Sequence, residues 1–451
     1  MDASLLFLLS LPLLVAMLLA AGGVVLLLGS IQSLVMGVAL VLGTALVDSL
    51  QSGQPLLHIG LALYPGDLMC LILVPAALVR WLRPARMPDE RPAVPLGWWV
   101  FSAAVMLSLA QGLLSFGTKA GVQVRDYFYF VVVVSYVTSF PYRPELLQRL
   151  LAWLAGLGGL LLLLTTYRWI VYYTPIPSLL PPGGVYNIDG PIRVIWSNDA
   201  LLLGQLLIGA LYFADAAPAL RTLRLWVPVL LGYVLALQHR SVWGAVLVGA
   251  LSPLLSGRRA ASAWRQLGLF ALILAVVVLP LLLAPRSELA AQIGQSAQRA
   301  VRGQDTTAER LQSWGVILRR WVDLGPRSIA IGNPFGTDNS RYVIDSGGTP
   351  RLLEYGAHNM YVQTVFNTGL LGLAGFLAAL VAVLRGLRRR IAAEPSQPLP
   401  VLLFTLNVTL VVYFVPYGVT YVQGLWLGLG AACAAVVQAP VSWRGGRHAA
   451  A

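Results

Sequence analysis

Charged residues are scarce in this chain of 451 residues: they make up 11% of it, whereas hydrophobic residues make up 58%. A soluble domain carries about 25% charged residues, so this composition excludes an ordinary soluble protein. Apolar runs of about 20 residues recur along nearly the whole length, and a helix of that length crosses the hydrocarbon core of a bilayer. The sequence therefore predicts an all-α polytopic membrane protein whose surroundings are a lipid bilayer.

Cysteine and histidine are also rare. Cys70 and Cys433 lie inside apolar runs, so we interpret them as core residues rather than as a disulfide. The four histidines do not pair with carboxylates at metal-ligand spacing, so we predict no metal site. The chain has no phosphate-cradling glycine loop, which disfavours ATP-driven transport, and we expect no cofactor. Acidic residues in the spans are few, with Asp67 and Asp126 the main candidates, which argues against a proton-coupled carrier.

The net charge of +13 would suggest nucleic-acid binding in a soluble protein. Here the arginines gather on alternate inter-span loops, near 80–91, 143–149, 221–224, 258–265, 385–390 and 444–447. Cytoplasmic retention of positive charge produces this pattern, so we expect no nucleic-acid partner. The segment Leu5–Leu28 lacks a basic start and a small-residue cleavage site, and we interpret it as a retained span rather than a signal peptide.

We expect about 12–13 transmembrane helices in a single transmembrane domain, residues 1–451. The predicted spans are 5–29, 31–48, 60–82, 96–116, 126–140, 147–170, 200–217, 224–238, 242–256, 264–284, 359–387, 398–416 and 419–438. If the arginine clusters are cytoplasmic, the remaining loops, among them 49–59 and 117–125, face outwards. Two of these are long, 171–199 and 285–358, and a functional pocket should lie there because tight turns cannot build one.

The large loop 285–358 contains two predicted amphipathic helices. The first begins near Ser287 and ends at Gly303; the second begins with a capping box, Thr306 followed three residues later by Glu309. Its apolar residues recur at helical spacing: Leu311, Trp314, Leu318 and Trp321. We expect both helices to lie on the membrane surface and to roof a cavity in the helix bundle.

Four arginines lie at or near the outer ends of spans or at the start of the second surface helix, against the charge rule: Arg125, Arg193, Arg240 and Arg310. Taken singly, each could be an arginine that anchors a helix end by extending to the membrane interface. A permanently charged guanidinium also fits phosphate oxygens with two parallel hydrogen bonds. Together they suggest a site for an anionic lipid headgroup or a lipid-linked diphosphate.

His358 lies where the large loop meets the next apolar helix. One interpretation is a histidine that caps the helix through the backbone. The alternative is a general base, because an imidazole can take a proton from a hydroxyl at neutral pH. Asn359 or Glu354 could orient the imidazole, and the sequence does not choose between them.

Several motifs follow one another in a fixed order. His358-Asn359 is followed after nine residues by Gly369-Leu370-Leu371-Gly372, and Gly332-Asn333-Pro334-Phe335-Gly336 precedes it. Upstream lie Gln238-His239-Arg240-Ser241-Val242-Trp243, Glu309-Arg310-Leu311-Gln312-Ser313-Trp314 and the polar stretch from Arg193 to Asn198-Asp199. In order and spacing over residues 190–375, this set resembles the O-antigen ligase and O-antigen polymerase superfamily, bacterial inner-membrane glycan transferases.

The resemblance implies a GT-C-like fold and a metal-independent, inverting glycosyltransferase whose active site faces the periplasm. Its donor would be a glycan on undecaprenyl diphosphate, and its acceptor a glycan or lipid A core. The residues implied are His358, Arg240 and Arg310 for catalysis, and Arg193, Arg125, Asn359 and Trp314 for binding the diphosphate and glycan. Other proteins of polysaccharide assembly are expected partners.

Two kinds of alternative stay open. Within the superfamily, we favour a polymerase of O-antigen or exopolysaccharide over a ligase of lipopolysaccharide biosynthesis that transfers the glycan to lipid A core. Outside it, a glycolipid transporter or flippase would also place arginines at the outer surface, but it would need cationic residues along a whole path through the bundle. Convergence of Arg240, Arg310 and His358 on one pocket would favour the enzyme.

Overall fold

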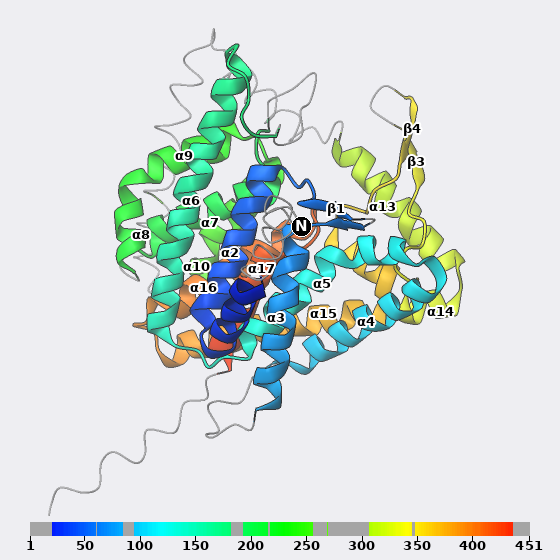
Figure 1. Cartoon of the computed structure of the whole chain (residues 1–451), viewed down its shortest axis with the longest axis horizontal. Helices are drawn as coiled ribbons and strands as arrows, with labels where there is room; N and C mark the ends of the chain where they lie inside the picture. The colour runs from blue at the N-terminus through cyan, green and yellow to red at the C-terminus, as the bar shows by residue number, and fades with distance from the viewer. Residues whose placement is uncertain are drawn as a thin grey trace, which may run out of the picture.

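The structure is a computed structural model and describes residues 20–59, 61–83, 94–181, 193–214, 217–255, 268, 306–344 and 348–435. Within these residues the protein is almost entirely helical (Figure 1). The predicted span 264–284 and the first surface helix, from Ser287 to Gly303, lie outside the described residues apart from residue 268. So do much of the span 5–29 and residues 182–192 of the loop 171–199.

The helices up to residue 212 are α2 (Leu34–Gln51), α3 (Pro65–Leu82), α4 (Leu96–Phe116), α5 (Thr118–Thr138), α6 (Pro144–Tyr173) and α7 (Ser197–Tyr212). Those that follow are α8 (Pro218–Leu223), the short 3-10 helix η2 (Arg224–Trp226), α9 (Val227–Ala236), α10 (Arg240–Leu255), α13 (Thr306–Asp323), α14 (Pro326–Ile331), α15 (Met360–Ala393), α16 (Pro398–Tyr413) and α17 (Tyr421–Ala434). Two antiparallel hairpins join them: β1 (Leu57–Ile59) pairs with β2 (Leu61–Leu63), and β3 (Arg341–Ile344) pairs with β4 (Pro350–Leu353).

Six of the described helices are long and apolar enough to cross a membrane: Leu34–Gln51, Pro65–Leu82, Leu96–Phe116, Pro144–Tyr173, Pro218–Ala236 and Met360–Ala393. Three shorter apolar helices accompany them: Ala20–Gln32, Arg240–Leu254 and Pro398–Tyr413. Large apolar side chains also cover the outside of the bundle, and Leu82 and Leu114 are 82% and 91% exposed. A surface of this kind is suited to lipid rather than water, so the chain is an all-α membrane protein.

Helices α7, α16 and α17 are the most deeply buried of the described helices. Nearly every residue of α7 and α17 is buried, as expected for helices that are apolar on all sides. Helix α15 packs along α4, and the two backbones meet at Gly97 and Gly375. A Cβ atom on Gly97 would lie 2.6 Å from the Gly375 carbonyl oxygen, so the approach requires glycine at this position.

Most predicted spans coincide with helices, and the largest difference falls at residues 117–125. The sequence predicts an outward-facing loop here, and the segment contains Lys119, Gln123 and Arg125. Instead only Gly117, at φ 58°, interrupts the chain, and α5 begins at Thr118. The polar side chains are accommodated because they line internal cavities rather than a loop surface.

The predicted second surface helix corresponds to α13, which begins at Thr306 as expected and is followed by Gly325-Pro326. The buried side of α13 contacts the start of α15: Ile317 packs with Ala357, Val362 and Phe366. Trp314, Leu318 and Trp321 pack against the same cluster. In Figure 1, α13 and α14 lie with the β3–β4 hairpin on one side of the bundle, away from α8 and α9.

Helix α15 is bent at Gly369, which has the non-helical angles φ 65° and ψ −168°. The turn after α14 docks on this bend, since a Cβ atom on Gly332 would lie 2.3 Å from the Thr368 nitrogen. Asn333 then donates from its backbone N–H and its side-chain amide to the Phe366 carbonyl, at 2.8 and 3.1 Å. These bonds satisfy a carbonyl that the bend removes from the helical ladder. The turn and the bend therefore form one backbone-to-backbone contact.

Candidate active site

His358 lies immediately before α15 with its backbone in the left-handed region, at φ 47°. Asn359 then caps the helix, because its side-chain oxygen accepts a hydrogen bond from Val362 N–H at 3.0 Å. The Met360 N–H donates to the carbonyls of Phe414 and Tyr417, at 2.9 and 3.0 Å. The capping role foreseen as an alternative for His358 thus belongs to Asn359, and His358 exposes its ring to a cavity.

The residue before His358 is held from both sides. Trp314 of α13 donates its indole N–H to the Ala357 carbonyl at 2.7 Å. The Ala357 N–H donates to the side-chain oxygen of Gln363, one turn into α15, at 2.8 Å. Both partners are fixed in helices, so the peptide leading into His358 has little freedom. Trp314, predicted to bind substrate, therefore contacts the backbone beside the histidine and does not line the cavity.

Arg341, which the sequence does not single out, clamps the same segment from β3. It is 4% exposed, and its guanidinium donates to Ser313 Oγ at 2.6 Å. Its remaining hydrogen bonds go to the carbonyls of Asn339, Tyr355 and Gly356, at 3.0, 2.6 and 3.2 Å. A buried guanidinium needs this full set of acceptors, so the fold uses Arg341 to shape the chain between β4 and α15. No motif marks it, because its acceptors are carbonyls that only the fold brings together.

The cavity beside His358 has a volume of about 750 Å³. Among the predicted site residues it is lined by His358, Asn359, Arg310 and Arg193. Further polar residues complete its wall: Lys119, Asp126, His239, Glu309, Arg341, Arg351 and Glu354. These residues come from α5, α13, β3, β4, the β4–α15 connection and the stretches before α7 and α10, so the cavity lies where distant parts of the chain meet. Its volume is in the range of small-molecule binding sites.

Arg310 and Arg193 are half-buried arginines of this cavity without a matched anion, whereas Arg351 is exposed and Arg341 is held by backbone carbonyls. Among the described residues neither Arg310 nor Arg193 forms an ion pair or a hydrogen bond, although the Arg310 guanidinium lies 5.4 Å from the centre of the Tyr417 ring. Burial lowers the pKa of Arg193, and the neighbouring charge of Arg310 lowers it further. Arginine still stays charged at neutral pH. The two guanidinium groups therefore repel each other, and an anion placed between them would relieve that repulsion.

His358 lines the same cavity as Arg193 and Arg310. The centre of its ring lies 4.7 Å from the centre of the Tyr355 ring. Burial by the surrounding protein lowers the pKa of His358 to about 4, and the charges of Arg310 and Arg341 add to the effect. The ring is therefore neutral at pH 7, with one nitrogen free to accept a proton. Neutral imidazole is the form that a general base requires.

His239 also lines the cavity but has a different environment. It is buried, and its Nε2 lies 3.1 Å from the Ile195 carbonyl oxygen. Burial, together with the charge of Arg193, lowers the pKa of His239 to about 3, so its ring is neutral and Nε2 is the atom that donates. We interpret His239 as a residue that holds the stretch carrying Arg193.

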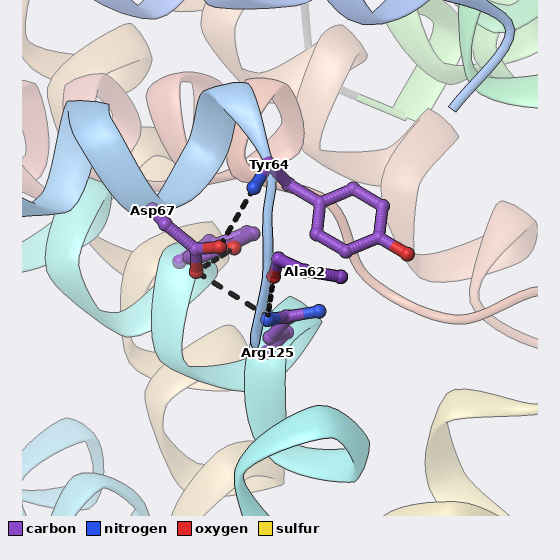
Figure 2. Close-up of polar contacts among 5 residues, drawn as sticks. Ala62, Tyr64, Asp67 and Arg125 are labelled. Atoms are coloured by element: carbon purple, nitrogen blue, oxygen red, sulfur yellow. Dashed lines mark hydrogen bonds and ion pairs between the residues drawn. The ribbon is translucent and has the colours of Figure 1, made fainter. Parts of the chain in front are cut away.

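Arg240 and Arg125 do not line this cavity. Arg240 is the first residue of α10, next to His239. Arg125 lines a second cavity instead and is paired with Asp67, whose Oδ1 lies 3.5 Å from its Nε (Figure 2). Its Nη2 also donates to the Ala62 carbonyl at 2.6 Å. The structure thus joins four of the seven predicted site residues in one cavity, with Trp314 directly behind them.

No protein-family model matches the chain, and no curated protein shows significant similarity to it, so the family resemblance of the motifs around His358 stays a prediction.

Proposed function

We propose that the chain is a membrane glycosyltransferase of the polysaccharide-polymerase type. It would transfer a glycan from undecaprenyl diphosphate to a sugar hydroxyl at the periplasmic face of a bacterial inner membrane. The observation that carries the proposal is the arrangement of a neutral histidine beside two arginines without a matched anion, in one cavity. The ordered motifs over residues 190–375 are the second support.

The reaction follows from these groups. The acceptor oxygen attacks the anomeric carbon, the bond from that carbon to the diphosphate oxygen breaks, and the hydroxyl proton passes to His358. The diphosphate leaves with added negative charge, which Arg310 and Arg193 stabilise. One displacement of this kind inverts the anomeric configuration. Holding both substrates in one cavity lowers the entropic barrier to the attack.

The low pKa of His358 has a role in this scheme. Burial disfavours the imidazolium, and the charges of Arg310 and Arg341 add to the effect. A diphosphate bound between Arg310 and Arg193 would cancel much of that positive field, and its own charge would favour the imidazolium. Donor binding therefore raises the pKa of His358 and makes the ring a stronger base at the moment when a base is needed.

The test is reconstitution of the full chain in liposomes with a defined undecaprenyl-diphosphate glycan. We expect elongation of the lipid-linked glycan, and a loss of about 100-fold or more when Arg310 or Arg193 becomes alanine, as for other groups that stabilise a leaving anion. Arg389→Ala is the matched control, because Arg389 is an exposed arginine of α15 outside the cavity.

The products separate the alternatives. Transfer only to lipid A core would replace the polymerase with the ligase. Movement of the intact glycolipid across the bilayer with no new glycosidic bond would overturn the proposal in favour of a transporter. Full activity of both arginine variants would remove the assigned diphosphate site.

A further inference from the structure

A second cavity, of about 430 Å³, adjoins the candidate active site. Five residues line both cavities: Val122, Asp126, Trp196, Asn198 and Thr420. The two cavities therefore share part of their lining and lie side by side. Apart from Arg125 and Tyr129 of α5, the other residues of the second cavity lie at or beside the ends of α2, α3 and α17.

The two cavities differ in charge. Among the described residues, two carboxyl groups line the smaller one, Asp48 and Asp126, and one cation, that of Arg125. That guanidinium is offset by Asp67 and lies over the Tyr64 ring, at 4.5 Å from its centre. Figure 2 shows Asp67 between the Tyr64 N–H and Arg125. The smaller cavity is thus net negative, whereas basic residues outnumber acidic ones around the larger cavity.

Aromatic rings form much of the remaining wall. Tyr64, Tyr129, Tyr421 and Trp196 all line the smaller cavity. The Tyr421 hydroxyl donates to Asp48, and the Tyr129 hydroxyl donates to Asp67. These bonds fix the rings and leave each carboxylate with further acceptor positions.

Carboxylates beside aromatic rings are suited to a sugar. Carboxylate oxygens accept hydrogen bonds from hydroxyl groups, and the C–H face of a pyranose packs against an aromatic ring. The same carboxylates repel a diphosphate and an acidic sugar. We propose that the smaller cavity binds the terminal sugar of the acceptor and that this sugar is neutral or carries an amine. This inference rests on the proposed glycosyl transfer, because only that reaction requires two sugar-bearing substrates side by side.

Asp126 is the group that connects the two sites. It lies on α5, lines both cavities and is exposed within them. The next residue, Tyr127, is buried and its hydroxyl lies 3.2 Å from Thr364 Oγ1 of α15, which ties this part of α5 to the helix that follows His358. Asp126 can therefore hold one hydroxyl of the acceptor sugar while its neighbour on the ring points to the donor.

Saturation-transfer NMR on the full chain in lipid nanodiscs tests the proposal. The probes for the smaller cavity are the methyl glycosides of glucose, glucosamine and glucuronic acid; the probe for the larger cavity is undecaprenyl diphosphate. The variants are Asp48→Asn and Asp126→Asn, which keep side-chain size, and Arg310→Ala. Asp323→Asn is the control, because Asp323 is exposed at the end of α13 and lines neither cavity.

We expect the glucoside and the glucosaminide to bind and the glucuronide not to bind. Either second-cavity variant should weaken the glucosaminide about tenfold, the effect of losing one hydrogen bond to a charged group. Asp48→Asn should leave undecaprenyl diphosphate unaffected. Asp126→Asn should not weaken it, because Asp126 also lines the larger cavity, where its charge repels a diphosphate. Arg310→Ala should weaken the binding of undecaprenyl diphosphate and leave the binding of the glucosaminide unaffected. Size-exclusion profiles check that each variant is folded. Because two aspartates are tested separately, the proposal can still be tested if one of the two variants fails to fold.

Failure has two distinct forms. If undecaprenyl diphosphate binds through Arg310 but no glycoside binds, or the glycosides ignore both aspartate variants, the acceptor site is wrong and the proposed function stands. If the glycosides bind through Asp48 and Asp126 but undecaprenyl diphosphate does not bind, the proposed donor is wrong. Preference for the glucuronide would overturn the charge argument directly.

Discussion

At the scale of single residues, the feature that matters most is the backbone of His358, which has φ 47°. A branched or bulky residue is strained there, whereas asparagine adopts the left-handed region more readily. His358→Asn therefore keeps the local conformation and removes the base. We expect transfer to fall about 100-fold to 10,000-fold in this variant, with donor binding preserved, measured as initial rates of glycan extension.

The control for this substitution is His58→Asn, because His58 is an exposed histidine of β1 that lines neither cavity. A rate near that of the unmodified protein in His358→Asn would reduce His358 to a residue that shapes the start of α15. Loss of expression or of the monodisperse profile would instead assign it a role in folding.

The pKa of His358 predicts an unusual pH dependence. In the free protein it is about 4, so the neutral form persists down to that pH. The acid limb of kcat/KM, which reports the free enzyme, should therefore lie near pH 4 and well below the usual histidine value of about 6.5. The acid limb of kcat should lie at higher pH, because bound diphosphate stabilises the imidazolium. Coincident limbs would contradict the donor-dependent shift.

The lowered pKa of His358 also determines how its contribution to the free energy of unfolding changes with pH. The folded value is below the unfolded value of about 6.5. The contribution of His358 to stability is therefore complete above pH 6.5 and declines as the pH falls toward 4, because the unfolded chain then binds the proton more tightly.

At the scale of elements, the docking of the Gly332 turn on the bend at Gly369 predicts a pronounced effect of one methyl group. The angles of Gly369 are accessible only to glycine, and a Cβ atom there would lie 2.4 Å from the Ala330 carbonyl carbon. We expect Gly369→Ala to destabilise the protein by more than about 2 kcal/mol, from strain and overlap together. Thermal unfolding in detergent measures this.

Gly315→Ala is the matched control for that substitution. Gly315 lies within α13 with no atom in the way of a Cβ. Alanine should raise helix stability by about 0.5–1 kcal/mol there. Equal effects of the two substitutions would mean that the contact between turn and bend does not support the fold.

Two tryptophans of α13, Trp314 and Trp321, donate to different carbonyls, so we expect their substitution to affect kcat differently. Trp314 donates to the Ala357 carbonyl, beside His358, whereas Trp321 donates to the Ser328 carbonyl, at 2.7 Å in each case. Trp314→Phe keeps the packing and removes the bond, so His358 loses a restraint. We expect kcat to fall about tenfold, the effect of losing one buried hydrogen bond, with KM for the donor unchanged.

Trp321→Phe removes a bond of the same length on the same helix and should leave kcat unchanged. A rise in KM without a change in kcat for Trp314→Phe would mean that the indole contacts substrate, as the sequence first suggested. A parallel loss in both variants would indicate a general loosening of α13.

At the scale of the whole molecule, the positive charge of the site comes from several elements: Arg193 before α7, Arg310 on α13 and Arg341 on β3. Arginines can supply the stabilisation of a leaving diphosphate that magnesium supplies in metal-dependent transferases. We therefore expect activity to survive exhaustive chelation, measured as glycan extension in EDTA with and without added divalent metal. Inhibition by the chelator that added metal reverses would refute the metal-independent mechanism.

The sequence predicts local elements well, because apolar runs and capping residues act within a few turns. The start of α13 at Thr306 and the spans at α4 and α16 are examples. It does less well where a polar residue is placed by distant partners. The sequence suggests a diphosphate site at Arg125, whereas the structure pairs it with Asp67. Arg341 carries no motif, although it organises the approach to His358. Partners far apart in the chain decide such roles.

The contact between the Gly332 turn and the Gly369 bend also determines which segment should be moved as a whole in a chimera of two such proteins. Residues 326–372 carry both halves of this contact, the β3–β4 hairpin and His358. A chimera that imports a foreign loop ending before His358 would bring a turn shaped for one bend onto a helix shaped for another. Chimeras that move the whole segment should retain a native interface, so substrate preference is transferable only together with part of the transmembrane helix.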